Sequence, residues 1–439
     1  MKKFIILIAA GLFCLQGQAQ EKWSLQKCID YALANNIVIK QYQINTEYRE
    51  NLLQQSKNDR LPDLSANVSQ GFSFGRSLTI DNTYDNYTSA NTGVSASTSM
   101  LLWRGGTLNH TIRQRDFELK SSLEDLQKAK DDITLSIASG YLEILFAKEL
   151  LKVAEAQVEQ TLQQIERTRS LIEAGKVAEG ALLEIQSQKA REELDVVNRQ
   201  NNLQIAYLNL AQILELEDYT QFDIEIPQLP ELKAQAGMAS AVSVYQNAVE
   251  KRPEIKSAGY QLQSFESQLK VAEGSLLPSL SFSAGFYDQY LNTTQADVPG
   301  FIDQITDNHR ESVGLNLNIP IFSRFQNKTN IANAKLQMKN QELQLEGAKK
   351  DLRRQIEQAY TNALAALNRF NASQVAVKSM QESFRYIEEK FNVGRVTSVE
   401  YNDAKTKLAV AESDRIQAKY DFIFRSKILD FYNGIPIEL

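Results

Sequence analysis

Two carboxylates near the end of the sequence have a spacing that could bind cations. Glu400 and Asp403 lie three residues apart, about one helical turn, so both would project from one face of a helix. Copies of such a pair, gathered by symmetry, would favour cations, most strongly multivalent ones. A solvated acidic helix start, which the helix dipole stabilises, explains the same residues. The spacing leaves both interpretations open.

No other group of residues has the spacing of an enzyme or metal site. His110 and His309 are isolated in the sequence, and no His, Cys or Asp cluster matches the spacing of metal ligands. Gly175-Lys176 resembles the end of a phosphate loop, but the earlier glycine is missing and Val177 replaces the required Ser or Thr. We therefore expect no catalytic residue, no metal and no cofactor.

The helices that would position these residues are unusually long. No proline occurs between Arg104 and Ala174, so one helix there would span roughly 105 Å. Its apolar residues follow a heptad spacing with a single four-residue step, and the pattern recurs 219 residues later. The first series is Leu119, Leu126, Ile133, Ile137, Ile144, Leu151, Val158, Ile165 and Ile172, and the second is Met338, Leu345, Leu352, Ile356, Ala363, Phe370, Val377, Phe384 and Phe391. Shorter helices are expected at 24–60 and 240–276, and from Val177 and Val396 onward.

Glycine-centred turns end both long helical segments. Gly175 lies in "EAGKV" and Gly394 in "NVGRV", at matching positions of the two heptad series. A glycine in this place is usually a helix C-cap. The alternative is that both turns form a free tip on which a partner's helical hairpins dock.

The chain is duplicated. "LPDLS" at Leu61 matches "LPSLS" at Leu277, 216 residues later, which predicts repeats of about 20–220 and 236–439 with a linker at 216–239. Further along the chain the offset is 219 residues, as in the heptad series, and at that offset Glu184 in the first repeat matches Asp403 in the second.

Four segments alternate apolar residues with small polar ones, which predicts strands at 61–75, 91–103, 277–291 and 311–322. Their uncharged polar faces, and a length close to the 9–11 residues that cross a bilayer at a tilt, favour membrane strands over a water-soluble sandwich. Four strands alone would leave unpaired edges in lipid. We expect three chains to close a 12-stranded barrel with a wet lumen.

The first residues predict export. Lys2 and Lys3 precede an apolar run, and small residues before Gln20 predict a signal peptide at 1–19. No later apolar run approaches the roughly 20 residues of a membrane-spanning helix. The net charge of −6 disfavours nucleic acid as a partner, because phosphate binding needs a basic patch.

Together these features resemble the TolC-like outer-membrane efflux family, also called outer-membrane factors. The duplicated halves, the two "LP" strand entries, "PIF" at Pro320 and "VGRVTSVEYNDA" from Val393 carry the resemblance. It implies a homotrimer in the outer membrane of a Gram-negative bacterium, with antiparallel coiled-coil hairpins forming a periplasmic tunnel and 216–239 forming an equatorial region. It also implies an exit duct that receives substrates from a periplasmic adaptor and an inner-membrane pump.

The resemblance assigns roles to the acidic residues and the turns. It makes Glu400 and Asp403, with Glu184 from the first repeat, a gate at the periplasmic entrance. It makes the turns the adaptor-docking tips, with Gly175, Lys176, Val177, Gly394, Arg395, Val396 and Thr397 as contact candidates. A structural or adhesive coiled-coil protein of the envelope, without transport, stays open as the alternative.

Overall fold

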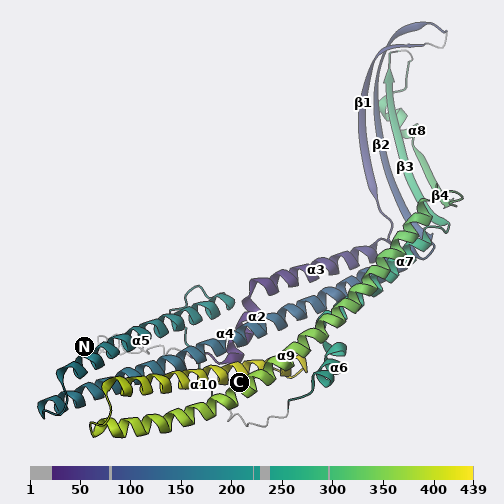
Figure 1. Ribbon diagram of the computed structural model, residues 1–439. Helices are drawn as coiled ribbons and strands as arrows, with labels where there is room; N and C mark the ends of the chain where they lie inside the picture. The colour runs from purple at the N-terminus through teal and green to yellow at the C-terminus, as the bar shows by residue number, and fades with distance from the viewer. Residues whose placement is uncertain (1–21, 79–81, 221, 228–237, 295–296, 439) are drawn as a thin grey trace, which may run out of the picture. The chain divides into compact units, whose positions relative to one another are not determined.

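The computed structural model describes residues 22–78, 82–220, 222–227, 238–294 and 297–438. The predicted signal peptide at 1–19 lies outside these ranges. The chain divides into two compact units, the first made of residues up to 43, 125–255 and 348–439, and the second of 44–124 and 256–347. Each unit therefore draws on both halves of the sequence (Figure 1).

The long helices repeat with identical lengths. Helices α4 (Thr107–Glu173) and α9 (Gln326–Asn392) have 67 residues each, which corresponds to about 100 Å. Each is followed by a helix of 35 residues, α5 (Glu179–Ile213) or α10 (Ser398–Tyr432), that runs back along it (Figure 1). The structure confirms the predicted duplicated hairpins, and every residue of both heptad series is buried or half-buried.

The helices that precede the strands are each broken once, so the prediction of continuous helices at 24–60 and 240–276 is wrong. The first repeat has α2 (Leu25–Asn35) and α3 (Ile37–Asn58), of 11 and 22 residues. The second has α6 (Ala241–Lys251) and α7 (Pro253–Gly274), of the same two lengths.

A different residue causes each break. Asn36 adopts an extended conformation, and its Oδ1 accepts hydrogen bonds from the backbone N–H groups of Val38 (2.9 Å) and Ile39 (3.4 Å), so it starts a new helix. In the second repeat Arg252 is extended and Pro253 follows it. Proline disfavours the helical conformation in the residue before it and suits the first position of a helix.

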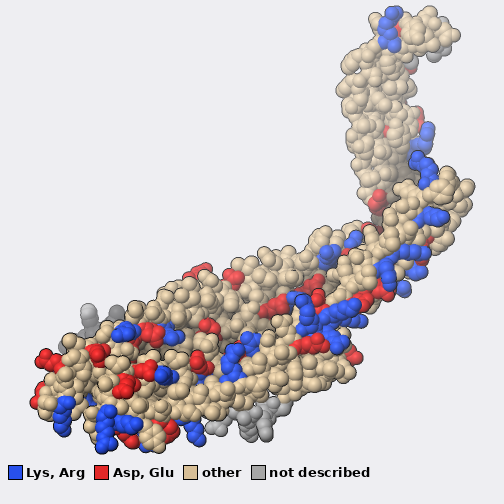
Figure 2. All heavy atoms as spheres, in the orientation of Figure 1, with Lys and Arg blue, Asp and Glu red and all other residues tan. Residues whose placement is uncertain are grey.

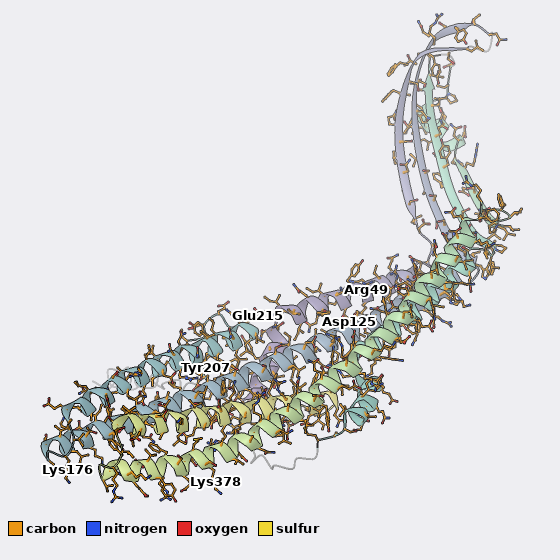
Figure 3. All side chains as sticks on the ribbon, in the orientation of Figure 1. Arg49, Asp125, Lys176, Tyr207, Glu215 and Lys378 are labelled. Atoms are coloured by element: carbon orange, nitrogen blue, oxygen red, sulfur yellow. The ribbon has the colours of Figure 1, made fainter. Side chains whose placement is uncertain are left out.

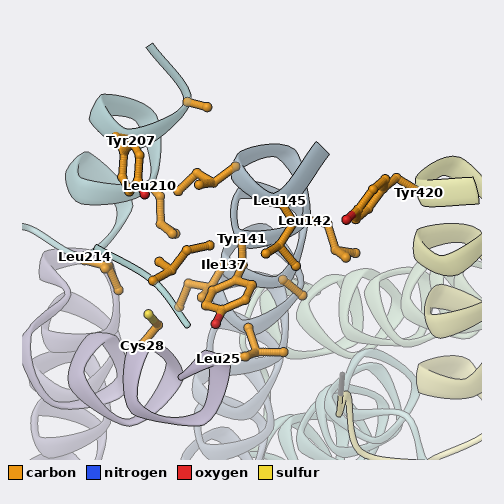
Figure 4. Packing of buried hydrophobic residues seen from close by; sticks show 14 of the residues in the cluster. Leu25, Cys28, Ile137, Tyr141, Leu142, Leu145, Tyr207, Leu210, Leu214 and Tyr420 are labelled. Atoms are coloured by element: carbon orange, nitrogen blue, oxygen red, sulfur yellow. The ribbon is translucent and has the colours of Figure 1, made fainter. Parts of the chain in front are cut away.

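The core of the first unit forms where α2, α4, α5 and α10 meet (Figure 4). The heptad residues Ile137 and Ile144 are fully buried there, as is Cys28. Tyr141 lies between Ile137 and Ile144 on α4, and its hydroxyl donates to the carbonyl oxygens of Trp23 (3.1 Å) and Glu225 (2.7 Å). These bonds fix part of the predicted linker at 216–239, of which residues 221 and 228–237 lie outside the described ranges.

The second unit contains one antiparallel sheet. Its strands are β1 (Ser65–Leu78), β2 (Tyr84–Arg104), β3 (Ser279–Thr293) and β4 (Arg310–Asn318), in that order across the sheet. The register sets apolar residues side by side, for example Met100, Phe282 and Leu315 on adjacent strands. Figure 2 shows a visible face of the sheet with few charged side chains, whereas both signs of charge cover the helices.

Strand bounds differ from the predicted ones. β2 begins at Tyr84 rather than near 91, because residues 84–90 complete the hairpin with β1. β4 ends at Asn318 rather than 322, since Pro320 has no N–H to donate to a ladder and restricts the residue before it. A bulge between Leu101 and Trp103 sets Trp103 opposite Leu280, so Leu102 does not continue the expected alternation.

Both outer edges of the sheet lack a strand partner within the part of the chain that the structure describes. These edges are β1 and β4, and their apolar side chains are largely exposed: Val68 is 72% and Val313 77% exposed. In the same ranges, no helix is both long and apolar enough for a membrane crossing.

Candidate functional site

The two glycine turns have the same backbone geometry. Gly175 has φ +69°, its N–H donates to the Ile172 carbonyl (2.8 Å), and the next N–H, of Lys176, donates to the Leu171 carbonyl (2.9 Å). Gly394 has φ +71° with the same two bonds one repeat later. This is a Schellman motif, which satisfies the last carbonyls of a helix and needs a left-handed residue. A Cβ at either glycine would touch nothing within 4 Å, so the glycine is required by conformation rather than by space.

The turn residues differ in how much of each side chain reaches solvent. Lys176 and Arg395 are exposed, and Figure 3 shows Lys176 at the end of the α4–α5 hairpin. Val177 and Val396 are half-buried, one residue further along each turn. Both predicted tips therefore present a cation next to a partly covered valine.

Glu400 belongs to the start of helix α10. Thr397 is its N-cap: the Thr397 Oγ1 accepts from the Glu400 N–H (3.3 Å), and Glu400 Oε2 accepts from the Thr397 N–H (2.8 Å). These reciprocal bonds form a capping box. Hydrogen bonds from the Thr397 backbone and side chain lower the pKa of Glu400. The Glu400 carboxylate thus stabilises the helix start and is held in its charged form.

The other two predicted gate residues have different partners. Asp403 is exposed and pairs with Lys407 on the next turn, with 2.7 Å between Oδ2 and Nζ. Glu184 on α5 accepts a hydrogen bond from the hydroxyl of Ser398, at the first position of α10. The structure therefore brings Glu184 to the same helix start as Glu400, although the two residues lie in different repeats.

Two buried charged residues near these positions were not predicted from the sequence. Lys405 Nζ donates to Glu192 Oε1 (2.9 Å), to the Gln157 carbonyl (2.9 Å) and to the Thr161 hydroxyl. Lys405 is 5% and Glu192 8% exposed. Burial lowers the pKa of Lys405, and its bond to Glu192 opposes that shift. The cluster ties α10 to both α4 and α5.

A sequence signal for this pair was present. Glu192 follows the fully buried Ile185 by seven residues, and Lys405 follows the buried Ser398 by seven. Both charges therefore hold interior heptad positions, where an unpaired charge is costly. The cluster also lines one end of an open cleft of about 700 Å³ between α4, α5 and α10.

A protein-family comparison matches both repeats. The model of the family described as "Outer membrane efflux protein" matches residues 28–215 and 244–429. The chain belongs to the outer membrane efflux protein family. Among its relatives, it is 23% identical over 446 residues to outer membrane protein TolC of Salmonella enteritidis, covering 99% of this chain and 86% of that protein. It is 20% identical over 433 residues to outer membrane efflux protein BepC of Brucella suis biovar 1, covering 96% and 89%.

Solved structures share the fold. CusC, whose structures describe transmembrane channel formation, superposes with a TM-score of 0.79 at 18% identity, over 94% of this chain and 92% of CusC. VceC of Vibrio cholerae superposes with a TM-score of 0.77 at 16% identity, over 94% of this chain and 97% of VceC.

As a member of the outer membrane efflux protein family, this protein is an exit duct in the outer membrane with a periplasmic helical tunnel. Its family consists of transport channels rather than enzymes.

Proposed function

We propose that three copies of this efflux protein assemble into one duct, which receives substrates from a periplasmic adaptor and an inner-membrane pump. The observation that carries the assembly is the sheet, which has one apolar face and, among the described residues, no strand paired with its two outer edges. In lipid, unpaired backbone groups at such edges cost several kcal/mol each, so the edges must pair with other copies. Three copies supply twelve strands, enough to enclose water.

Mass and conductance together test this proposal. Light scattering of the detergent-solubilised protein, corrected for bound detergent, should give the mass of three chains. Purified protein should produce ion-conducting channels in planar bilayers. An envelope adhesin, the alternative function, would conduct no ions. A stable monomer in membranes would contradict the trimer.

We further propose that Glu400, Asp403 and Glu184 form a cation-attracting gate at the periplasmic entrance. The contact of Glu184 with Ser398 supports this, because it gathers carboxylates from both repeats at one helix start. The lowered pKa of Glu400 favours its charged form. Symmetry would bring three such groups together near the axis.

We also propose that the two glycine turns are where the adaptor docks. The matched Schellman motifs and exposed cations of the two turns support one shared mode of recognition for both hairpins. The residues that would make contact are Gly175, Lys176, Val177, Gly394, Arg395, Val396 and Thr397.

A further inference from the structure

The last two strands of the sheet have unequal lengths. β3 has 15 residues and β4 only nine, and their pairing ends at Tyr287 and Arg310. Beyond that point, the edge of β3 that faces away from β2 meets the short helix α8 (Phe301–Asp307) instead of a strand (Figure 1). Helix α8, which precedes β4 in the chain, thus occupies the place along β3 that a longer β4 would fill.

Side-chain amides replace the missing strand in the hydrogen bonding of this edge. The Leu291 N–H donates to Gln304 Oε1 (2.9 Å), and Gln304 Nε2 donates back to the Leu291 carbonyl (2.8 Å). Asn308 Nδ2 donates to the Gln289 carbonyl (2.9 Å). A carboxamide offers the same donor and acceptor as a peptide group, so Gln304, 5% exposed, satisfies the edge as a strand residue would.

The helix leaves apolar side chains uncovered. Ile302 is 72% and Phe301 49% exposed, although one side of the Phe301 ring packs edge-on against Tyr290. At the opposite edge of the sheet, the end of β1 exposes Phe74 (76%) and Leu78 (49%). One chain thus has two separate apolar patches, one at each edge of its sheet.

The strand lengths bring these two patches together when copies close a barrel. β4 of one copy must pair with the 14-residue β1 of the next. If the ends nearest the helices are aligned, Asn318 lies opposite Ser65, and the nine residues of β4 extend to Ser73. Residues 74–78 of β1 then have no strand opposite them, and α8 lies where that strand would be.

We propose that α8 is part of the barrel wall and that its apolar side contacts residues 74–78 of β1 in a neighbouring copy of this chain. The inference rests on the proposed trimer. In the trimer, α8 of one copy would cover the external end of β1 in the next copy. Gln304 of the same helix covers the external end of β3 in its own chain. The wall of the barrel at its external end is therefore helix and strand rather than strand alone.

Cysteine cross-linking in outer membranes tests the contact. In a Cys28→Ala background, the pair Ile302→Cys and Phe74→Cys should give dimers and trimers with a short bis-maleimide linker. The matched control pairs Ile302→Cys with Val68→Cys. Val68 lies on the same strand face as Phe74 and is nearly as exposed, at 72% against 76%. Val68 is six residues, or roughly 20 Å, further from α8 and should not cross-link.

Each result has a distinct meaning when the mass is measured on the same samples. Cross-links from Phe74 and none from Val68 support the contact. A trimeric mass without cross-links from Phe74, or with equal cross-links from Val68, overturns the α8 contact and leaves the duct intact. A monomeric mass overturns the trimer itself, and the inference with it.

Discussion

Lys405 Nζ lies 2.9 Å from Glu192 Oε1, and neither side chain is more than one-tenth exposed. Removal of Lys405 leaves the Glu192 carboxylate buried without its ion-pair partner, although the Thr161 hydroxyl and the Gln188 amide still donate to it. Loss of one partner of a buried ion pair typically costs about 3–5 kcal/mol. We expect Lys405→Met to lower the thermal midpoint of the solubilised protein strongly, as measured by circular dichroism. The double variant Lys405→Met/Glu192→Met should recover much of that loss, because it leaves no buried charge in the pair.

Lys407 is the matched control, two residues away. Its pair with Asp403 has a similar distance, 2.7 Å, but both side chains are about three-fifths exposed. Exposed ion pairs contribute about 0–1 kcal/mol, so Lys407→Met should change the midpoint little. If Lys405→Met and Lys407→Met lowered the thermal midpoint equally, burial of the ion pair would not determine its contribution to stability.

Asp223 should make the first unit sensitive to acid. Burial alone would raise the pKa of Asp223, but hydrogen bonds from Lys148 and Tyr207 outweigh it and lower this pKa to about 2. A lowered pKa stabilises the fold above the unfolded value of 3.8, and this stability is lost as the pH falls toward 2. The contribution is on the order of 2 kcal/mol.

Thermal melts at pH 5 and pH 2.5 would measure this effect. Wild-type protein should lose more stability between the two pH values than Asp223→Asn, which cannot titrate at this position. Asp218→Asn is the control. Hydrogen bonds from Thr220, two residues along the chain, also lower the pKa of Asp218, but this carboxylate is exposed, so its titration should change the stability little. Identical pH dependence in wild type and Asp223→Asn would contradict the assignment.

The sequence predicted elements whose signals are local and repeated. The heptad series located α4 and α9, and the alternation of apolar residues located the four strands. The sequence did not predict contacts between residues that are far apart along the chain. Ser398 and Glu184 are 214 residues apart, and Lys405 and Glu192 are 213 apart, so no local pattern pairs them. The beginning of β2 was missed because residues 84–90 lack the alternation and are held by pairing with β1.

Charge reversal at the exposed tip cations should weaken adaptor binding. Lys176→Glu and Arg395→Glu change the charge of the proposed docking turns without removing a buried contact. We expect loss of export and of adaptor co-purification, with normal trimer yield. Lys378 is also exposed and lies within α9 (Figure 3), so Lys378→Glu should leave both unchanged. Export that survives both tip variants would place docking elsewhere on the protein.

Neutralising the proposed gate should remove its preference for cations. In Glu400→Gln the amide oxygen can still accept from the Thr397 N–H, so the capping box and the helix start are retained. Glu400→Gln/Asp403→Asn then removes two charges per chain from the entrance with little change in fold. Single-channel recordings should show a cation-selective wild type that a trivalent cation blocks from the tunnel side. The double variant should lose most of the selectivity and the block.

A control with the same change in net charge separates the entrance from the rest of the channel. Asp351→Asn/Glu357→Gln removes two exposed carboxylates from α9, about 55–65 Å along the helix from Gly394. If the gate residues set selectivity, this control should conduct like wild type. If both double variants behave alike, or if neither differs from wild type, Glu400 and Asp403 are a solvated helix start. In that case the lowered pKa of Glu400 reflects helix capping alone.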